Sequence, residues 1–469
     1  MTVSEYLINL GYTTIDGDFR NEIDTWGEWY KGQTAFHSYS VFNGRLKRDC
    51  KREFLGMAKK VSEDWANLIL NERVQINPAD ERFAEAFKTV LAFNNFQVRG
   101  NQLMELTFAL GTGATVEYLD IQSRVVIDYI RASMIFPISW DNGEITECAF
   151  ASQRQYDGED CYYINLHLLE NGKYKIINKM INKETGTEML LTDGLIPEIY
   201  TNSERPRFQI YMPNICNNID LDCPMGISVY ANAISNLKNC DMVFDSYNNE
   251  FRLGKKRILI PTTMTQIAMS DAGTMTPIFD DNDTEFYALN VSGNSTIDKP
   301  VEINMELRAD AHEKGLQTAL NLLSDKCGLG TDRYEYQASS GVKTATEIVS
   351  EKSALFQNLK KHELVTERAL INMTATVAEM MGYNPDMAIT INFDDSIIQD
   401  TDSIRQQALL EFNSGLIDEV EYFVRVYNLT EDEAIKKIAD MRARKEPEPG
   451  LQDTAPETDG EDTAGGVDE

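Results

Sequence analysis

The sequence has few residues of the kinds that hold structural metals or build disulfide frameworks. Its seven cysteines are scattered, and none belongs to a C-x-x-C pair. The four histidines are also far apart in the chain. Because zinc sites need closely spaced Cys and His ligands, we expect no metal site and no bound cofactor. The odd number of thiols favours buried cysteines in a reducing compartment.

Basic residues are scarce relative to acidic ones. The 469-residue chain contains 44 Lys and Arg against 75 Asp and Glu, which gives a net charge of −31. Phosphate backbones attract Lys and Arg and repel carboxylates, so this balance argues against a protein that grips nucleic acid tightly. Residues 446–469 hold nine acidic and no basic residues. We therefore expect an acidic, disordered tail and a folded part that still carries large acidic surfaces.

Long apolar runs are also missing. No stretch of eighteen or more apolar residues occurs, so we expect no membrane-spanning segment and no membrane partner. The first residues, MTVSEYLINLGYTT, lack the basic and apolar regions of a secretory signal. We expect the protein to remain in the cytoplasm of its host or in a particle assembled there. Its length suggests two to four domains or subdomains.

Motifs for phosphate binding are incomplete. Residues 111–113 read Gly-Thr-Gly but lack the Gly-Lys-Ser/Thr that completes a phosphate loop. Residues 341–344 read Gly-Val-Lys-Thr, in which a valine separates the glycine from the lysine. Turns and helix starts explain both better than a nucleotide site, although weak anion contact at Lys343 stays open.

Carboxylate clusters could in principle hold Mg²⁺ for a nuclease reaction. They occur at 280–283 and at Asp394, Asp395 and Asp400. No basic substrate groove or converging ligand set accompanies them, and the chain lacks the motifs of nucleophilic or metal-dependent catalysis. We therefore predict no catalytic residue and a protein that is not an enzyme, with solvated turn residues at these positions.

The apolar pattern predicts an α+β fold that is mainly helical. Residues 1–110 show helical spacing, and a helix over about 48–70 places Trp65 on its apolar face. From Gly111 the period changes, and 111–215 read as an antiparallel sheet. Turn signals at 142–143, 157–158 and 171–172 separate its strands, because Asn-Gly and Asp-Gly between alternating runs are typical of hairpins.

Two long amphipathic helices follow, on either side of a polar insert. The first is expected from Gly226 to about Gly254 and the second from about 304 to 326. The insert, about 256–303, shows weak strand patterns and little apolar content. We predict that these helices pack through apolar stripes made of Ile227, Tyr230, Ile234, Leu237, Phe244, Tyr247, Phe251, Leu316, Leu320 and Leu323.

The rest of the chain alternates between polar loops and helices. A loop at 331–341 leads into a long helix expected from Thr344 to about Met381, which starts with the capping box Thr-Ala-Thr-Glu. A strand is expected within 387–398. Three short helices are expected at about 402–413, 416–427 and 431–444, before the acidic tail.

This order of elements resembles the portal proteins of tailed double-stranded-DNA bacteriophages, especially the siphovirus type from hosts with Gram-positive cell walls. Several local sequences also resemble that family and together span nearly the whole chain up to about residue 444. They are AKKVSEDWANLILNERVQI (58–76), GISVYANAISNLKNCDMVFDSYNNEFRLGKKRILIP (226–261), VKTATEIVSEKS (342–353) and INFDDSIIQD (391–400).

The resemblance implies a portal fold with a wing, a two-helix stem, a small α/β clip, a tunnel loop with a long helix, and a helical crown. By position, the parts would be the wing (1–225, helical in 1–110 and antiparallel β in 111–215), stem helix 1 (226–255), the clip (256–303), stem helix 2 (304–328), the tunnel loop (329–342), the long wing helix and returning strand (343–400), the crown (401–445) and the disordered acidic tail (446–469).

The resemblance also implies partners and a place in the virion. Members of the family form homo-oligomeric rings, typically dodecamers, at one capsid vertex. Double-stranded DNA passes through the ring without sequence-specific binding. The other implied partners are the terminase large subunit, a head–tail adaptor, and the major capsid and scaffolding proteins. A minor capsid or head component without a channel is the alternative interpretation. The residues implied to line the DNA tunnel are Asp332, Arg333, Tyr334, Glu335, Tyr336 and Lys343.

Overall fold

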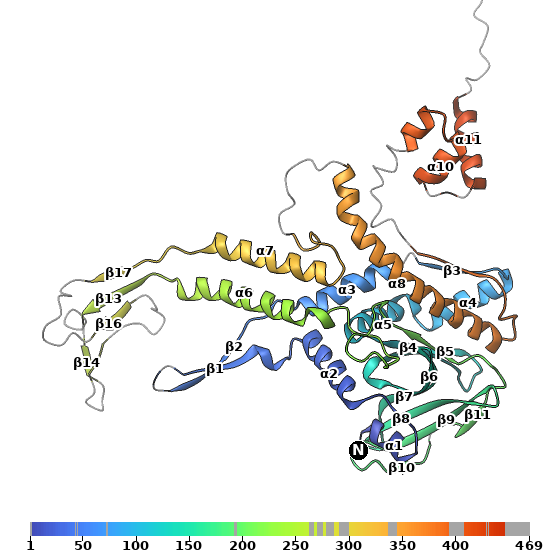
Figure 1. The fold of residues 1–469 in the computed structure, drawn as a ribbon, viewed down its shortest axis with the longest axis horizontal. Helices are drawn as coiled ribbons and strands as arrows, with labels where there is room; N and C mark the ends of the chain where they lie inside the picture. The colour runs from blue at the N-terminus through green and yellow to red at the C-terminus, as the bar shows by residue number, and fades with distance from the viewer. Residues whose placement is uncertain are drawn as a thin grey trace, which may run out of the picture. The chain divides into compact units, whose positions relative to one another are not determined.

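The computed structural model describes residues 2–445 except 43, 45, 72–73, 192–194, 262–266, 270–274, 278–285, 290–299, 336–344, 394–407, 428 and 430. The chain divides into two compact units, Met1–Asp394 and Asp395–Glu469. The described residues combine helices and strands, which confirms the predicted α+β class (Figure 1).

The first part of the chain is largely helical, as predicted for 1–110. Several of its helices begin with a side-chain cap: the Asp80 side chain, for example, accepts hydrogen bonds from the Arg82 and Phe83 amides at the start of α4. The helices are α1 (Val3–Asn9), α2 (Gly17–Lys31), α3 (Met57–Ile69), α4 (Glu81–Phe93) and α5 (Phe96–Leu110).

The prediction of an entirely helical start was wrong in two places. Strands β1 (Ser38–Phe42) and β2 (Lys47–Lys51) form an antiparallel hairpin. Strand β3 (Gln75–Pro78) pairs with β18 (Ile389–Asn392), the strand predicted within 387–398. The hairpin lacks alternation of apolar and polar residues because it buries neither face, so no period-two signal marks it.

The β region forms two antiparallel sheets rather than the one predicted. One has the order β10-β9-β8-β7-β6, with β11 also paired to β9, and the other has the order β12-β4-β5. A short 3-10 turn, Ala132–Met134, lies between β5 and β6 and separates the sheets. The strands are β4 (Gly113–Leu119), β5 (Val125–Arg131), β6 (Ile135–Asp141), β7 (Glu144–Tyr156), β8 (Glu159–Glu170), β9 (Lys173–Asn182), β10 (Glu188–Met189), β11 (Glu198–Tyr200) and β12 (Phe208–Tyr211).

The three predicted hairpin turns are confirmed. In each turn both central residues have positive φ, at 142–143, 157–158 and 171–172. They join β6 to β7, β7 to β8 and β8 to β9. The last two pairs run in unbroken register, whereas the β6–β7 pair shifts register around Ser139. A left-handed conformation at both central positions matches the twist of the flanking strands, and Asn, Asp and Gly tolerate it best.

Two antiparallel helices, α6 (Ile234–Leu253) and α7 (Ala309–Lys326), extend from this body side by side (Figure 1). The first begins eight residues later than Gly226, its predicted start. Gly226 is pressed against Gly111, since a Cβ there would lie 2.4 Å from the Gly111 carbonyl oxygen. The Val229 amide donates to the Phe108 carbonyl at 3.0 Å. These contacts hold the segment in a non-helical path along α5.

The start of the second long helix was also predicted too early, at about 304 instead of Ala309. Arg308 donates from its backbone and its guanidinium to the Glu250 carboxylate near the end of α6. These hydrogen bonds lower the pKa of Glu250 to about 2. Arg308 is therefore held by the neighbouring helix before α7 begins.

The insert between α6 and α7 contributes strands in its described residues. Strand β13 pairs in parallel with β16 and antiparallel with β17, and β14 pairs with β15. Weak strand patterns are expected within this insert at 277–279 and 285–291. The second contains β16, whereas the first shares only Pro277 with β15 and otherwise lies outside the described residues. The strands are β13 (Arg257–Pro261), β14 (Ile267–Met269), β15 (Met275–Pro277), β16 (Phe286–Leu289) and β17 (Val301–Ile303).

The predicted long helix is confirmed as α8 (Ala345–Met380), although its capping Thr344 lies outside the described residues. The second unit contains a described helical turn at 408–413, then α10 (Glu419–Tyr427) and α11 (Glu431–Lys445). Phe423, Ala434 and Ile438 form its apolar core. The three predicted helices correspond to these segments: the first is described only from 408, the second starts at Glu419 rather than about 416, and the third matches its predicted bounds.

One buried carboxylate within the smaller sheet makes no direct ion pair in the described chain, although the Arg207 guanidinium is close enough to favour its charge. Glu117 on β4 is fully buried and accepts a hydrogen bond from the Thr115 hydroxyl at 2.7 Å. Its second carboxylate oxygen has no hydrogen-bond partner among the described residues. Burial raises the pKa of Glu117 to about 7, and hydrogen bonds from Thr115 and Gln209 oppose this shift only in part.

Glu117→Gln is expected to remove a pH dependence of stability. The folded-state pKa lies above the unfolded value of roughly 4.3, so Glu117 destabilises the fold increasingly as the pH rises from about 4.5 to 7. The variant should match the wild type near pH 4.5 and exceed it at pH 8 by up to about 3 kcal/mol. Thermal unfolding between pH 4.5 and 8 measures this difference. Glu28→Gln, at an exposed position, is the control, and a pH-independent difference for Glu117→Gln would contradict the interpretation.

Candidate functional site

The loop after α7 contains the residues predicted to line the tunnel, and two glycines shape its described start. Gly328 and Gly330 have φ values of +80° and +82°. This left-handed conformation ends a helix at little cost only for glycine. Leu329, between them, is buried. The chain therefore leaves α7 by a sharp, fixed turn.

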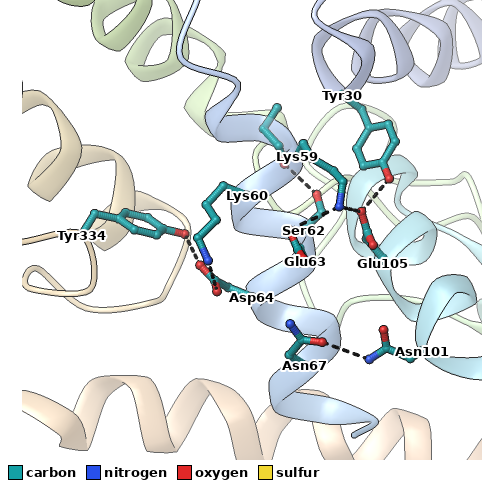
Figure 2. A network of polar contacts seen from close by, with 11 residues as sticks. Tyr30, Lys59, Lys60, Ser62, Glu63, Asp64, Asn67, Asn101, Glu105 and Tyr334 are labelled. Carbon is teal, nitrogen blue, oxygen red and sulfur yellow. Dashed lines mark hydrogen bonds and ion pairs between the residues drawn. The ribbon is translucent and has the colours of Figure 1, made fainter. Parts of the chain in front are cut away.

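A buried carboxylate on α3 anchors this loop (Figure 2). Asp64 is only 4% exposed, and its Oδ2 accepts a hydrogen bond from the Tyr334 hydroxyl at 2.9 Å. Its Oδ1 lies 3.2 Å from Arg333 Nη2 and 2.7 Å from Lys60 Nζ. Two cations and a phenol thus compensate one buried negative charge. Burial beside Asp64 raises the pKa of Tyr334 above its usual range, so the phenol stays protonated and donates.

Further contacts tie the loop to three helices. The Tyr334 carbonyl accepts a hydrogen bond from Gln317 Nε2 of α7 at 3.2 Å. The Trp65 indole of α3 donates to the Cys327 carbonyl at 3.0 Å. Asn358 of α8 donates to the Gly328 carbonyl at 3.0 Å. The described half of the loop is therefore a fixed platform at the junction of α3, α7 and α8.

The other side of α3 is held by a second polar cluster, also drawn in Figure 2. Lys59 Nζ lies 2.6 Å from Glu105 Oε1 of α5 and 3.3 Å from Glu63. The Tyr30 hydroxyl of α2 donates to the same Glu105 oxygen at 2.6 Å. Lys59 and Lys60 are consecutive in sequence, yet Lys59 pairs with Glu105 of α5 and Lys60 pairs with Asp64. This arrangement fixes the rotation of α3 and hence the direction of Asp64.

The structure brings together part of the predicted tunnel-loop set. Arg333 and Tyr334 meet at Asp64, while Asp332 is half-buried and Glu335 is exposed. Tyr336 and Lys343 lie outside the described residues. Contact of this set with DNA stays a prediction.

Sequence reasoning missed Asp64. Its signal was an acidic residue four positions after Lys60, placed between the buried Val61 and Trp65 on the apolar face of a helix. A carboxylate in that position requires a partner from another element.

The stem residues predicted from the apolar pattern fall into two groups. Ile227 and Tyr230 belong to the body, because both are fully buried and the Tyr230 hydroxyl donates to the Trp26 carbonyl at 2.9 Å. The other eight lie on α6 and α7. Leu237, Leu320 and Leu323 are buried, whereas Ile234, Phe244, Tyr247 and Leu316 are half-buried and Phe251 is exposed.

The described residues contain no cluster of side chains that could ligate a metal. Within them, no three His, Cys, Asp or Glu side chains converge in a way that could hold a metal ion. The acidic clusters at 280–283, 394–395 and 400 lie outside the described residues. A search of the described helices found none that is both long and apolar enough to cross a membrane.

The anchoring of the loop by Asp64 leads to a direct test. Tyr334→Phe removes a hydrogen bond to a charged group, which is worth roughly 1.5–3 kcal/mol. Backbone amides at 328–335 should then exchange with solvent about 10-fold faster or more, measured by hydrogen–deuterium exchange. Asp64→Asn should have at least the same effect. Tyr383→Phe is the control, and unchanged exchange in both loop variants would contradict the anchor.

Comparisons with known proteins are informative at the level of the family. One chain of the neck of an empty GTA particle shares 10% identity with this chain, covers 90% of it and 98% of its own length, and aligns with a TM-score of 0.39. No curated protein sequence matches significantly. The profile of the family described as "Phage portal protein, SPP1 Gp6-like" matches residues 12–448. Because this match spans more than nine tenths of the sequence, the chain belongs to the SPP1 Gp6-like family of phage portal proteins.

Proposed function

We propose that the chain is the portal subunit of a tailed bacteriophage and forms a closed homo-oligomeric ring at one capsid vertex. The ring, of twelve copies by resemblance to the family, surrounds a channel for DNA packaging and ejection. Family membership supports the portal role. The proposal includes the siphovirus type, a Gram-positive host and assembly in the host cytoplasm.

The observation that carries the ring is the uncovered apolar surface of the two long helices. Phe251 and Leu253 at the end of α6 are 42% and 56% exposed. Met242 of α6 and Leu322 of α7 are 49% and 54% exposed. Large exposed apolar side chains along one helix pair mark an interaction surface. Adjacent copies arranged head to tail around a ring would cover it, since such a contact repeats until the circle closes.

The fold supports a division of the chain by position. The described strands at 257–303 and the paired helices α6 and α7 fit a clip carried on a stem. We assign the wing to 1–225 and 343–400, stem helices to 226–255 and 304–328, the clip to 256–303, the tunnel loop to 329–342, the crown to 401–445 and a disordered acidic tail to 446–469. Within stem helix 1, the helical part is α6, and 226–233 remain with the body.

The tunnel loop would present its outer residues to passing DNA. Because Arg333 and Tyr334 are held by Asp64, we assign them to the anchored base of the loop. Tyr336 and Lys343 are then the predicted contacts beyond that base. An acidic wall would complement this function, since carboxylates repel the phosphate backbone and let a duplex slide.

The remaining partners follow from the portal role. We propose that the ring docks the terminase large subunit during packaging and a head–tail adaptor afterwards. The major capsid and scaffolding proteins would surround it during shell assembly. A minor head component without a channel is the competing function. It would have the same family match but no ring.

Imaging of the purified protein tests the ring. Negative-stain particles should be rings with a central hole, and the paired substitution Phe251→Ser with Leu253→Ser should reduce the ring fraction at least several-fold. The physical reason is the loss of apolar area that a neighbouring copy would bury. Ile121→Ser, at an 86% exposed turn position, is the matched control. Monomers or irregular aggregates from the wild-type chain under all conditions would favour the competing function.

The tunnel loop is tested by changing only the segment beyond its anchor. Replacement of 336–340 by a Gly-Ser sequence of equal length keeps Arg333 and Tyr334 in place. Rings should form at the wild-type level, while DNA packaged per particle should fall at least several-fold, measured by nuclease protection. Normal packaging by this variant would contradict the tunnel-loop assignment but not the proposed ring.

A further inference from the structure

The hairpin β1–β2 is an exposed projection that takes no part in the proposed ring contact through α6 and α7. Every residue of its two strands is exposed except Tyr39 and Cys50, which are half-buried. Figure 1 shows it extending away from the helices α2 and α6 near its base. A two-stranded sheet of this kind is marginally stable in water unless another surface packs against it.

The base of the hairpin is firmly attached to α6. Asp241, which is 4% exposed, lies 2.9 Å from His37 Nε2 and accepts the Leu55 amide at 2.9 Å. Asp245 accepts the Glu53 amide at 3.0 Å. At the same base, Arg52 lies over the rings of Phe36 and Tyr39. The strands therefore project from a fixed platform on the first stem helix rather than from a loose linker.

The far end of the hairpin is apolar. Val41, Phe42 and Leu46 are 46%, 68% and 67% exposed and lie next to the turn between the strands. Three large exposed apolar side chains on one short projection are typical of a protein contact, in which aromatic residues supply much of the binding energy.

The hairpin is also basic, in contrast with the rest of the chain. Residues 38–51 contain four basic residues and one acidic residue, whereas the whole chain carries a net charge of −31. In the described strands the exposed cations are Lys47, Arg48 and Lys51. Outside this segment the chain has 74 acidic and 40 basic residues, so another copy is of opposite charge overall. Complementary charge steers association and suppresses wrong orientations.

We infer that the β1–β2 hairpin is an arm that docks onto the acidic surface of a second copy of this chain. The apolar end supplies buried contact area, and the three cations supply orientation. Double-stranded DNA is the less favoured occupant, because phosphate contacts use Lys and Arg but give no reason to expose Val41, Phe42 and Leu46. The inference rests on the proposed ring, and it names a contact between subunits that lies outside the apolar surfaces of α6 and α7.

Two variants separate the two features of the arm. One combines Lys47→Glu, Arg48→Glu and Lys51→Glu, and the other combines Phe42→Ser with Leu46→Ser. Lys88→Glu is the control, since its side chain is 76% exposed on α4. Mass photometry over a protein dilution series gives the concentration at which half the chains are in rings. Each arm variant should raise this concentration at least 10-fold, and the control should leave it unchanged. Circular dichroism checks that all variants are folded.

A photocrosslinking residue at position 42 of the otherwise wild-type chain identifies the occupant. Covalent products between two copies, with the attached peptide located by mass spectrometry, are the expected result. Arm variants that form rings at the wild-type concentration would refute the arm while leaving the ring proposal standing. Normal rings with a loss of DNA retention would assign the hairpin to DNA and equally overturn the inference. A wild-type chain that never forms rings would refute the proposed function and the arm together.

Discussion

The burial of one indole holds the body of this protein together. Trp65 is fully buried, and its ring stacks on Phe108 of α5 with centroids 5.5 Å apart. Its plane meets the His362 ring of α8 edge-on at 4.7 Å. Its Nε1 donates to the carbonyl at the end of α7. Truncating such a side chain typically costs about 3–5 kcal/mol. Here it would also weaken the packing of α3, α5, α7 and α8 around one point.

The environment of Trp65 determines the chemistry of its neighbours. Burial lowers the pKa of His362 to about 3, so its imidazole is neutral and its Nδ1 accepts the Asn214 amide at 2.9 Å. Asp64, the preceding residue on α3, faces the loop and takes up Tyr334 and Arg333. Consecutive residues thus provide one apolar and one ionic attachment. The start of the loop proposed to contact DNA is therefore anchored by the same turn of α3 that carries Trp65 into the core.

Some of this structure could be predicted from the sequence because the signals are local. The three two-residue turns needed only Asn-Gly or Asp-Gly between strand patterns. The length of α8 followed from a sustained helical period. The start of α6 could not be predicted in this way, because Ile227 and Tyr230 keep the helical spacing while packing into the body. The close approach of Gly226 to Gly111 and the hydrogen bond from the Val229 amide to Phe108 exclude a helix there, and both join residues far apart in sequence.

The candidate site shows the same division. The loop at 331–341 could be located from its polar composition, whereas its anchor could not. Asp64 lies about 270 residues earlier and becomes a partner of Tyr334 only through the fold. The hairpin escaped notice for a different physical reason. Its two strands bury neither face within the chain, so no alternation of apolar and polar residues marks them in the sequence.

The length of α8 has a mechanical consequence. Its 36 residues extend for about 54 Å, and its buried residues run from Leu355 to Ala378, so most of this length is fixed in the body. Only the ten residues 345–354, roughly 15 Å of helix, lie between the loop and the first buried position. A tilt of about 5° at Leu355 would displace the start of the helix by only roughly 1 Å. The loop therefore leads into a nearly fixed point of the body.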